Sequence, residues 1–79
     1  MNELIQYVRD NQGHPIGVVV SVGKNQVGWS RKHKLDLWDR DKALMIARNR
    51  AVVGFKSKIP HDVRPIFSNM VDRSVRYYK

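Results

Sequence analysis

The run Ile16-Gly17-Val18-Val19-Val20-Ser21-Val22 is the richest β-branched stretch of this 79-residue chain, and it decides the predicted fold. A turn cluster, Asp10-Asn11-Gln12-Gly13-His14-Pro15, separates it from an earlier strand-like segment, Leu4 to Arg9. A second turn signal, Gly23-Lys24-Asn25-Gln26, leads to a short third run, Val27-Gly28-Trp29-Ser30. Two turns between three adjacent β runs predict an antiparallel meander.

The hydrophobic period changes from strand-like to helical after the third run. Between residues 39 and 53, the apolar positions gather on one side at helical spacing: Ala43, Leu44, Ile46, Ala47 and Ala51. Asp39 or Asp41 suits the positive N-terminal end of this helix, and Gly54 is placed to stop it. A second helix is expected over residues 62–78, where Pro65 falls in the first turn and removes no internal hydrogen bond.

These elements predict a single domain over residues 1–79 with an α+β fold. We expect a three-stranded antiparallel sheet covered by two C-terminal helices in the order β-β-β-α-α, arranged as a two-layer sandwich. The chain has no cysteine, so neither disulfides nor thiolate metal ligands can stabilise it. A chain of this length sits near the lower limit for one unaided core, so completion of the core by a homo-oligomer is an alternative.

Positive charge is concentrated in the middle of the chain. The formal net charge is +8 and the isoelectric point is about 10.3, above the value of about 9 that flags nucleic-acid binders. Residues 24–58 hold ten basic and three acidic side chains, whereas residues 1–23 hold one basic and two acidic ones. The field of the protein should therefore be strongest around this middle segment.

The segment Ser30-Arg31-Lys32-His33-Lys34 lies between two tryptophans, Trp29 and Trp38. Clustered cations bind phosphates with release of counterions, and aromatic rings can stack on unpaired bases. The alternative is a solvated loop with both tryptophans in the core. Helical phase places Arg48 on the exposed side of the first predicted helix, where it can contact a phosphate. An extended connector would place Lys56 and Lys58 on one side of the chain, where they either extend the basic surface or serve only as solubilising charges. The predicted nucleic-acid contacts are Arg31, Lys32, Lys34, Arg48, Lys56 and Lys58, with Trp29 and Trp38 as possible aromatic contacts.

Arg50 projects close to the apolar stripe of the first predicted helix. An unpaired charge on a buried face is costly, so this guanidinium needs a partner. We expect a structural salt bridge with Asp36, or a hydrogen bond to a backbone carbonyl, in preference to a ligand contact.

Enzymatic function is not expected. The three histidines are scattered without ligand spacing, and the chain contains no His-Glu-x-x-His motif, Gly-rich phosphate loop or nucleophile elbow. We predict no catalytic residue, metal or cofactor. The N-terminal residues lack the basic and apolar regions of a signal peptide, and no window resembles a membrane span. The sequence therefore predicts a cytoplasmic protein that does not bind membranes.

Several short motifs resemble those of a group of small, largely uncharacterised proteins encoded by tailed bacteriophages. They are Gly17-Val18-Val19-Val20, Val27-Gly28-Trp29-Ser30, Asp36-x-Trp38, Leu44-x-Ile46-Ala47-x-x-Arg50-Ala51, Ile59-Pro60 and Met70-x-x-Arg73. The resemblance runs from about Gly17 to Tyr78 and implies a phage origin and the cytoplasm of a host cell. Arg31 and Lys32 stand where similar proteins have an apolar residue and a cysteine, so the basic loop is a feature of this chain.

Two functions follow from the sequence. The first is a basic accessory protein that binds nucleic acid, either DNA or RNA, through phosphate contacts from the loop and helix. The second is a protein-protein interaction module that docks on an acidic host or viral protein and modulates its complex.

Overall fold

The computed structural model describes residues 2–54 and 58–78, and it confirms the predicted α+β fold and the order β-β-β-α-α. The elements are β1 (Leu4–Arg9), β2 (Pro15–Gly23), β3 (Gln26–Arg31), α1 (Arg40–Val53) and α2 (Arg64–Tyr77). Each helix lies within a residue or two of its predicted span. Within the described residues, no helix has the length and apolar character needed to cross a bilayer.

The three strands form an antiparallel meander in the order β1-β2-β3. In the first turn, the Asp10 carboxylate accepts hydrogen bonds from the backbone N–H groups of Gln12 and His14, both at 2.9 Å. These bonds, that from His14 first, hold the pKa of Asp10 below its ordinary value. In the second turn, Asn25 has a φ of 60°, a left-handed conformation that asparagine tolerates. Both turn clusters were thus correctly predicted.

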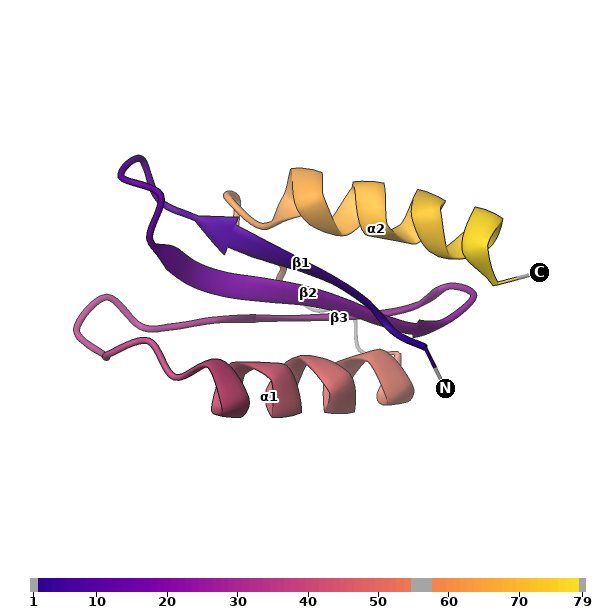
Figure 1. The fold of residues 1–79 in the computed structure, drawn as a ribbon, viewed down its shortest axis with the longest axis horizontal. Helices are drawn as coiled ribbons and strands as arrows, with labels where there is room; N and C mark the ends of the chain where they lie inside the picture. The colour runs from indigo at the N-terminus through magenta and orange to yellow at the C-terminus, as the bar shows by residue number, and fades with distance from the viewer. Residues whose placement is uncertain (1, 55–57, 79) are drawn as a thin grey trace.

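The two helices cover opposite faces of the sheet, so the fold has three layers and the expected two-layer arrangement is wrong (Figure 1). Consecutive β2 residues Val18, Val19 and Val20 are all fully buried. Since side chains alternate along a strand, Val18 and Val20 pack toward α1 and Val19 packs toward α2. An uninterrupted apolar run is typical of a strand covered on both faces, and β2 requires this arrangement.

The α1 layer packs unusually close to the sheet. Its buried residues are small except for one leucine: Ala43, Leu44, Ala47 and Ala51. Two of them, Ala47 and Ala51, lie against Gly28 of β3, where an added Cβ would collide with their backbone atoms. The helix begins at the Asp39 cap, whose side chain accepts from the Lys42 N–H, and ends at Gly54 with a φ of 75°.

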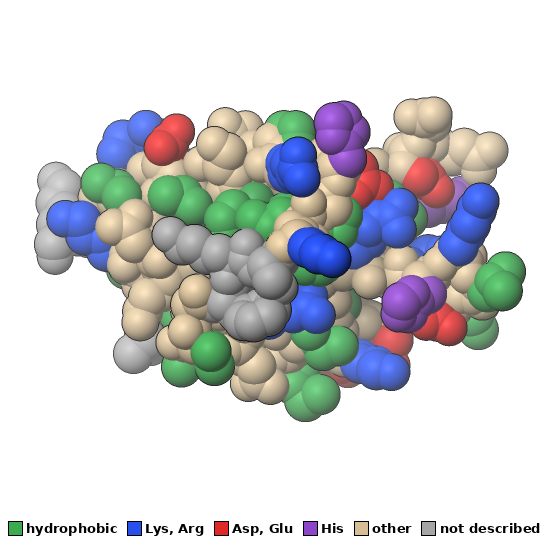
Figure 2. Space-filling view, turned by 180° about the vertical axis from the view of Figure 1, so that it is seen from behind, with side chains coloured by type: hydrophobic (Ala, Val, Ile, Leu, Met, Phe, Trp, Pro, Cys, Tyr) green, Lys and Arg blue, Asp and Glu red, His purple; other side chains and the backbone are tan. Residues whose placement is uncertain are grey.

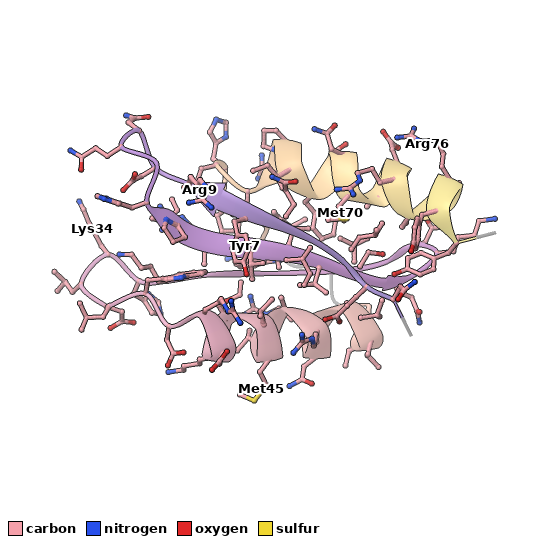
Figure 3. All side chains as sticks on the ribbon, in the orientation of Figure 1. Tyr7, Arg9, Lys34, Met45, Met70 and Arg76 are labelled. Atoms are coloured by element: carbon pink, nitrogen blue, oxygen red, sulfur yellow. The ribbon has the colours of Figure 1, made fainter. Side chains whose placement is uncertain are left out.

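The α2 layer contains the larger apolar side chains. Val63, Phe67 and Met70 pack with Val8, Val19 and Val27 of the sheet. Figure 3 shows Met70 pointing from α2 toward the strands, whereas Met45 on α1 points away from them. The end of α2 is tied to the sheet by Tyr78, whose single hydroxyl hydrogen is shared between the carbonyl oxygens of Asn2 (2.7 Å) and Ser21 (3.0 Å).

Candidate nucleic-acid interface

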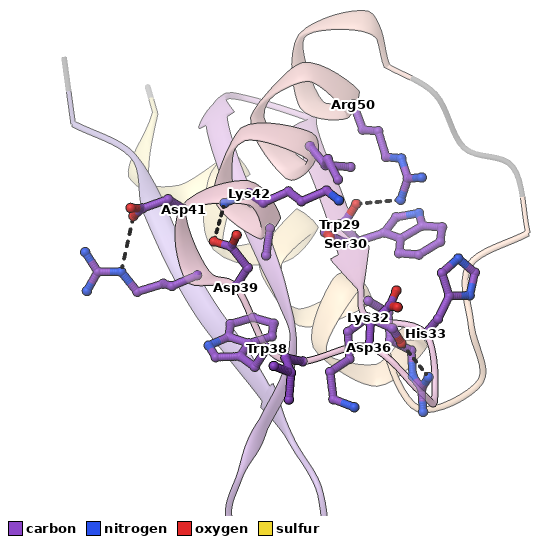
Figure 4. A pocket seen from close by; sticks show the side chains of 15 residues that line it. Trp29, Ser30, Lys32, His33, Asp36, Trp38, Asp39, Asp41, Lys42 and Arg50 are labelled. Atoms are coloured by element: carbon purple, nitrogen blue, oxygen red, sulfur yellow. Dashed lines mark hydrogen bonds and ion pairs between the residues drawn. The ribbon is translucent and has the colours of Figure 1, made fainter.

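A groove of about 1020 Å³ opens between the β3–α1 loop, the end of β3 and the first turns of α1 (Figure 4). The loop, residues 32–39, extends from the end of β3 and returns to α1 at Asp39. Both tryptophans of the chain line the groove, as do the imidazole of His33 and charged side chains from the strand, the loop and the helix: Arg31, Lys32, Asp36, Asp39, Arg40, Asp41, Lys42 and Arg50. In Figure 2 cationic and anionic side chains crowd toward the end of the molecule that carries this loop, and the surface is hollowed there.

The predicted loop residues separate into groove residues and tip residues. Arg31 and Lys32 line the groove, whereas Lys34 lies near the tip of the loop and points away from the body of the protein (Figure 3). Leu35 and Leu37 lie beside it and are 97% and 92% exposed. The sequence prediction missed these leucines, although two apolar residues flanking Asp36 in an otherwise polar loop are visible in the sequence.

Arg31 does not present a fully free charge to the groove. Its Nε donates to both carboxylate oxygens of Asp62, at 2.8 and 3.1 Å, and Nη1 donates to the Lys32 carbonyl at 3.3 Å. Both partners of the ion pair are about one-third to two-fifths exposed, so the pair is weak but offsets part of the positive field. Lys32 makes no such pair among the described residues and is the freer of the two cations.

The Arg50 guanidinium has a partner other than the expected Asp36 carboxylate. It lies 4.2 Å from the centroid of the Trp29 ring, and Nη1 donates to the Trp29 carbonyl at 2.9 Å (Figure 4). The Trp29 side chain packs with the α2 layer, so Arg50 reaches it from α1 past the outer edge of β3. A backbone carbonyl and an aromatic face thus take the place of the predicted salt bridge, and within residues 2–54 and 58–78 Asp36 forms no ion pair.

The two tryptophans are both partly buried. They are therefore neither freely exposed for stacking on bases nor fully buried in the core, the two alternatives that the sequence left open. Trp38 packs with the α1 layer and meets Tyr7 edge to face, with ring centroids 6.3 Å apart. The Trp29 indole N–H is buried and has no hydrogen-bond acceptor among the described residues. Each ring therefore serves the core and also forms part of the groove wall.

Arg48 lies outside the groove. Its Nε and Nη2 donate to the carboxylate of Glu3 in a forked pair, the shortest contact being 2.6 Å. These hydrogen bonds lower the pKa of Glu3 and raise the pKa of Arg48. Because residues two apart on a helix diverge by about 200°, Arg48 reaches toward β1 while Arg50 reaches β3. Helical phase correctly placed Arg48 on the surface but could not place Glu3 beside it.

The two connector lysines do not extend the groove. Lys58 is exposed and does not line it, and Lys56 lies outside the described residues. Two cations that were not predicted as contacts, Arg40 and Lys42, do line it because α1 begins beside the loop. Proximity to the loop in sequence was the available signal for both.

The groove has mixed charge with a positive excess. Five arginine and lysine side chains and three aspartates line it, for a net charge of +2. Asp39 is engaged as the cap of α1, and Asp41 lies 3.9 Å from Arg40. Within the ranges that the structure describes, no three histidine or carboxylate side chains are grouped closely enough to hold a metal ion.

Comparison with protein-family models, with curated proteins and with solved structures finds no match to this chain, so its function has to be inferred from the groove and the loop themselves.

Proposed function

We propose that the protein is a small basic accessory protein that binds nucleic acid, with the groove between the β3–α1 loop and α1 as the contact surface. The observation that carries the proposal is the groove itself, in which cations from three elements lie beside two tryptophans. Lysine and arginine neutralise phosphates, and a ring in the wall offers a stacking surface for a base. The role proposed is binding and not catalysis, and the resemblance to phage proteins suggests the cytoplasm of a host cell.

The dimensions of the groove favour unpaired nucleotides. Its volume of about 1020 Å³ is that of a site for one small organic ligand, whereas a duplex is comparable in width with the whole protein, whose shorter extents are 23 and 21 Å. Lys32 and Lys42 are the expected phosphate contacts, because neither forms an ion pair among the described residues. Arg50 contributes less, since its guanidinium is already held by Trp29.

The test is a salt titration of binding to single-stranded and double-stranded DNA and RNA, followed by fluorescence anisotropy. The variant Lys32→Gln/Lys42→Gln removes two charges from the groove, and Arg73→Gln/Arg76→Gln removes two from α2 as a matched control. Each lost phosphate contact to a single strand lowers the salt slope by about 0.7, so the groove variant should bind about 25-fold more weakly at roughly 0.1 M salt.

Two results would overturn this proposal. One is no detectable binding to any probe at low salt, and the other is equal weakening by the groove variant and by the α2 control. Equal weakening would mean that net charge alone attracts the probe.

The second candidate function, docking on an acidic host or viral protein, is favoured by the exposed leucines of the loop tip. Leu35 and Leu37 are almost fully exposed beside Lys34, and apolar side chains next to cations suit a protein interface. In a nuclease-treated host lysate, a stoichiometric partner should be retained by the Lys32→Gln/Lys42→Gln variant and lost with Leu35→Ser/Leu37→Ser. Retention of that partner by the leucine variant would exclude the loop tip as the docking surface.

A further inference from the structure

The outer edge of β1 is the least covered part of the sheet. On the opposite edge, Arg50 donates to the Trp29 carbonyl of β3. The backbone of α1 lies over β2 and β3 and not over β1, and Ile5 of β1 is 37% exposed. Among the described residues, nothing outside the sheet hydrogen-bonds to the main chain of residues 5–8. An open edge of this kind can pair with another strand.

We propose that β1 pairs with β1 of a second copy of this chain, antiparallel and about a two-fold axis at Gln6, to form a continuous six-stranded sheet. The strand is suited to pairing because it is regular: the irregularity between β1 and β2 comes from an extra residue, Ile16, in β2. The inference is independent of nucleic-acid binding.

The side chains of β1 divide between the two faces of the sheet. Tyr7 lies opposite Val18 and packs with it in the α1 layer, so Glu3, Ile5, Tyr7 and Arg9 face the α1 side. The intervening residues of β1 face the α2 side, where Leu4 and Val8 pack with the larger core. When two β1 strands pair about a two-fold axis, residues on the same face of the sheet lie opposite one another. The axis must therefore pass through a residue, and moving it to the next residue shifts the register by two.

A dyad at Gln6 matches every cross-strand pair by chemistry. On the α1 side, Ile5 would lie opposite Tyr7 of the second copy, and Glu3 opposite Arg9 of the second copy. On the α2 side, Leu4 would lie opposite Val8 of the second copy. Aromatic with β-branched, opposite charges and apolar with apolar are the pairings that stabilise antiparallel strands.

The neighbouring registers lack this match. With the dyad at Ile5, Leu4 would face Gln6 of the second copy and the carboxylate of Glu3 would face Tyr7. With the dyad at Tyr7, Arg9 would face Ile5 of the second copy and Gln6 would face Val8. Only the dyad at Gln6 pairs Glu3 with Arg9. The Glu3 carboxylate already accepts from Arg48 of its own chain, so it would lie between two guanidinium groups.

One new cysteine tests both the association and its register, because the chain has none of its own. In the proposed dimer the two Gln6 residues face each other across the axis, at a Cα separation of about 4.5–5.5 Å, which a disulfide can span. Gln6→Cys should therefore form a disulfide-linked dimer rapidly under mild oxidation. The control Gln12→Cys, also exposed but in the β1–β2 turn, should cross-link much more slowly.

Light scattering on the wild-type chain provides the second measurement. A strand contact over residues 3–9 is small, so we expect the mass to rise with concentration toward twice 9.2 kDa, with a dissociation constant on the order of micromolar to tens of micromolar. Ile5→Lys should weaken association at least about tenfold, because it places a charge opposite Tyr7 of the second copy. Its circular dichroism spectrum should remain that of the wild type.

The proposal fails if the wild-type chain stays monomeric at concentrations well above that range. It also fails if the chain dimerises but Gln6→Cys cross-links no faster than Gln12→Cys, since the interface would then lie elsewhere.

Discussion

Replacement of Gly28 by alanine tests whether α1 must lie as close to β3 as the structure places it. A Cβ at this position would overlap the Ala47 carbonyl oxygen and the Ala51 nitrogen, and would lie 3.0 Å from the Ala51 Cα. All three are backbone atoms, so no side-chain rotation can relieve the overlap. The helix would have to move by roughly 1 Å or more to restore normal contact distances.

Such a movement separates surfaces that are fully buried in the native protein, among them Ala47 and Ala51. Overpacking of this kind costs about 1–3 kcal/mol, and the rigid obstacle places Gly28→Ala at the upper end, near 3 kcal/mol. That is a large part of the roughly 5–15 kcal/mol that stabilises a typical domain. In a chain of this size it lowers the melting temperature by about 12–24 °C.

Urea and thermal unfolding followed by far-ultraviolet circular dichroism measure this effect, with Gly13→Ala as the control. Gly13 has a φ of +84° and open space around its Cα, so alanine there costs only about 1–2 kcal/mol for the left-handed backbone. The close approach of α1 to β3 would be refuted if Gly28→Ala were no more destabilising than Gly13→Ala.

Three further substitutions test individual side-chain contacts. Arg50→Gln should lower the free energy of unfolding, measured in urea, by about 1–2 kcal/mol, because it removes the cation–π contact with Trp29 and weakens the hydrogen bond to the Trp29 carbonyl. A change below about 0.5 kcal/mol would contradict a structural role for Arg50. Arg48 lowers the pKa of Glu3 in the folded protein from its ordinary value of 4.5. The ionised Glu3 carboxylate therefore stabilises the fold fully above pH 4.5, and this stabilisation is lost as the pH falls through the lowered pKa of the folded state. The wild type should therefore lose more stability than Glu3→Gln between pH 6 and about pH 3 in unfolding titrations, and parallel curves would argue against the pair. Tyr78→Phe should lower the free energy of unfolding by about 1 kcal/mol at neutral pH, because the hydroxyl hydrogen shared between the Asn2 and Ser21 carbonyls is lost. Burial raises the pKa of Tyr78, so the difference in stability between wild type and variant should shrink above pH 10.0, and a constant difference in alkaline unfolding curves would contradict this.

The secondary structure was predictable because its signals are local. Turn residues at 10–14 and 24–25 separate the strands, Asp39 caps α1, and Gly54 ends it in a left-handed conformation. The layering was predicted wrongly, although the run of valines in β2 already indicated cover on both faces. Val18, Val19 and Val20 do not alternate with polar residues, and a strand that is apolar on both sides needs cover on both faces.

The candidate site was only partly predictable. The basic loop and its flanking tryptophans are contiguous in sequence, and the structure places them around one groove. Partners distant in sequence could not be found this way: Asp62 pairs with Arg31 from 31 residues away, and Glu3 binds Arg48 from 45 residues away. Formal charge therefore overstated the free positive charge of the middle segment.

The sequence by itself determined the elements, their order and the location of the positive charge, because strand, turn and helix preferences and formal charge depend on neighbouring residues. Tertiary structure alone decided which cations remain free. Arg48 and Arg50, two residues apart, project to opposite flanks of α1, where one meets a carboxylate and the other a tryptophan. Folding brings those partners to each arginine from distant parts of the chain, and the energy of a charge depends on what surrounds it in space.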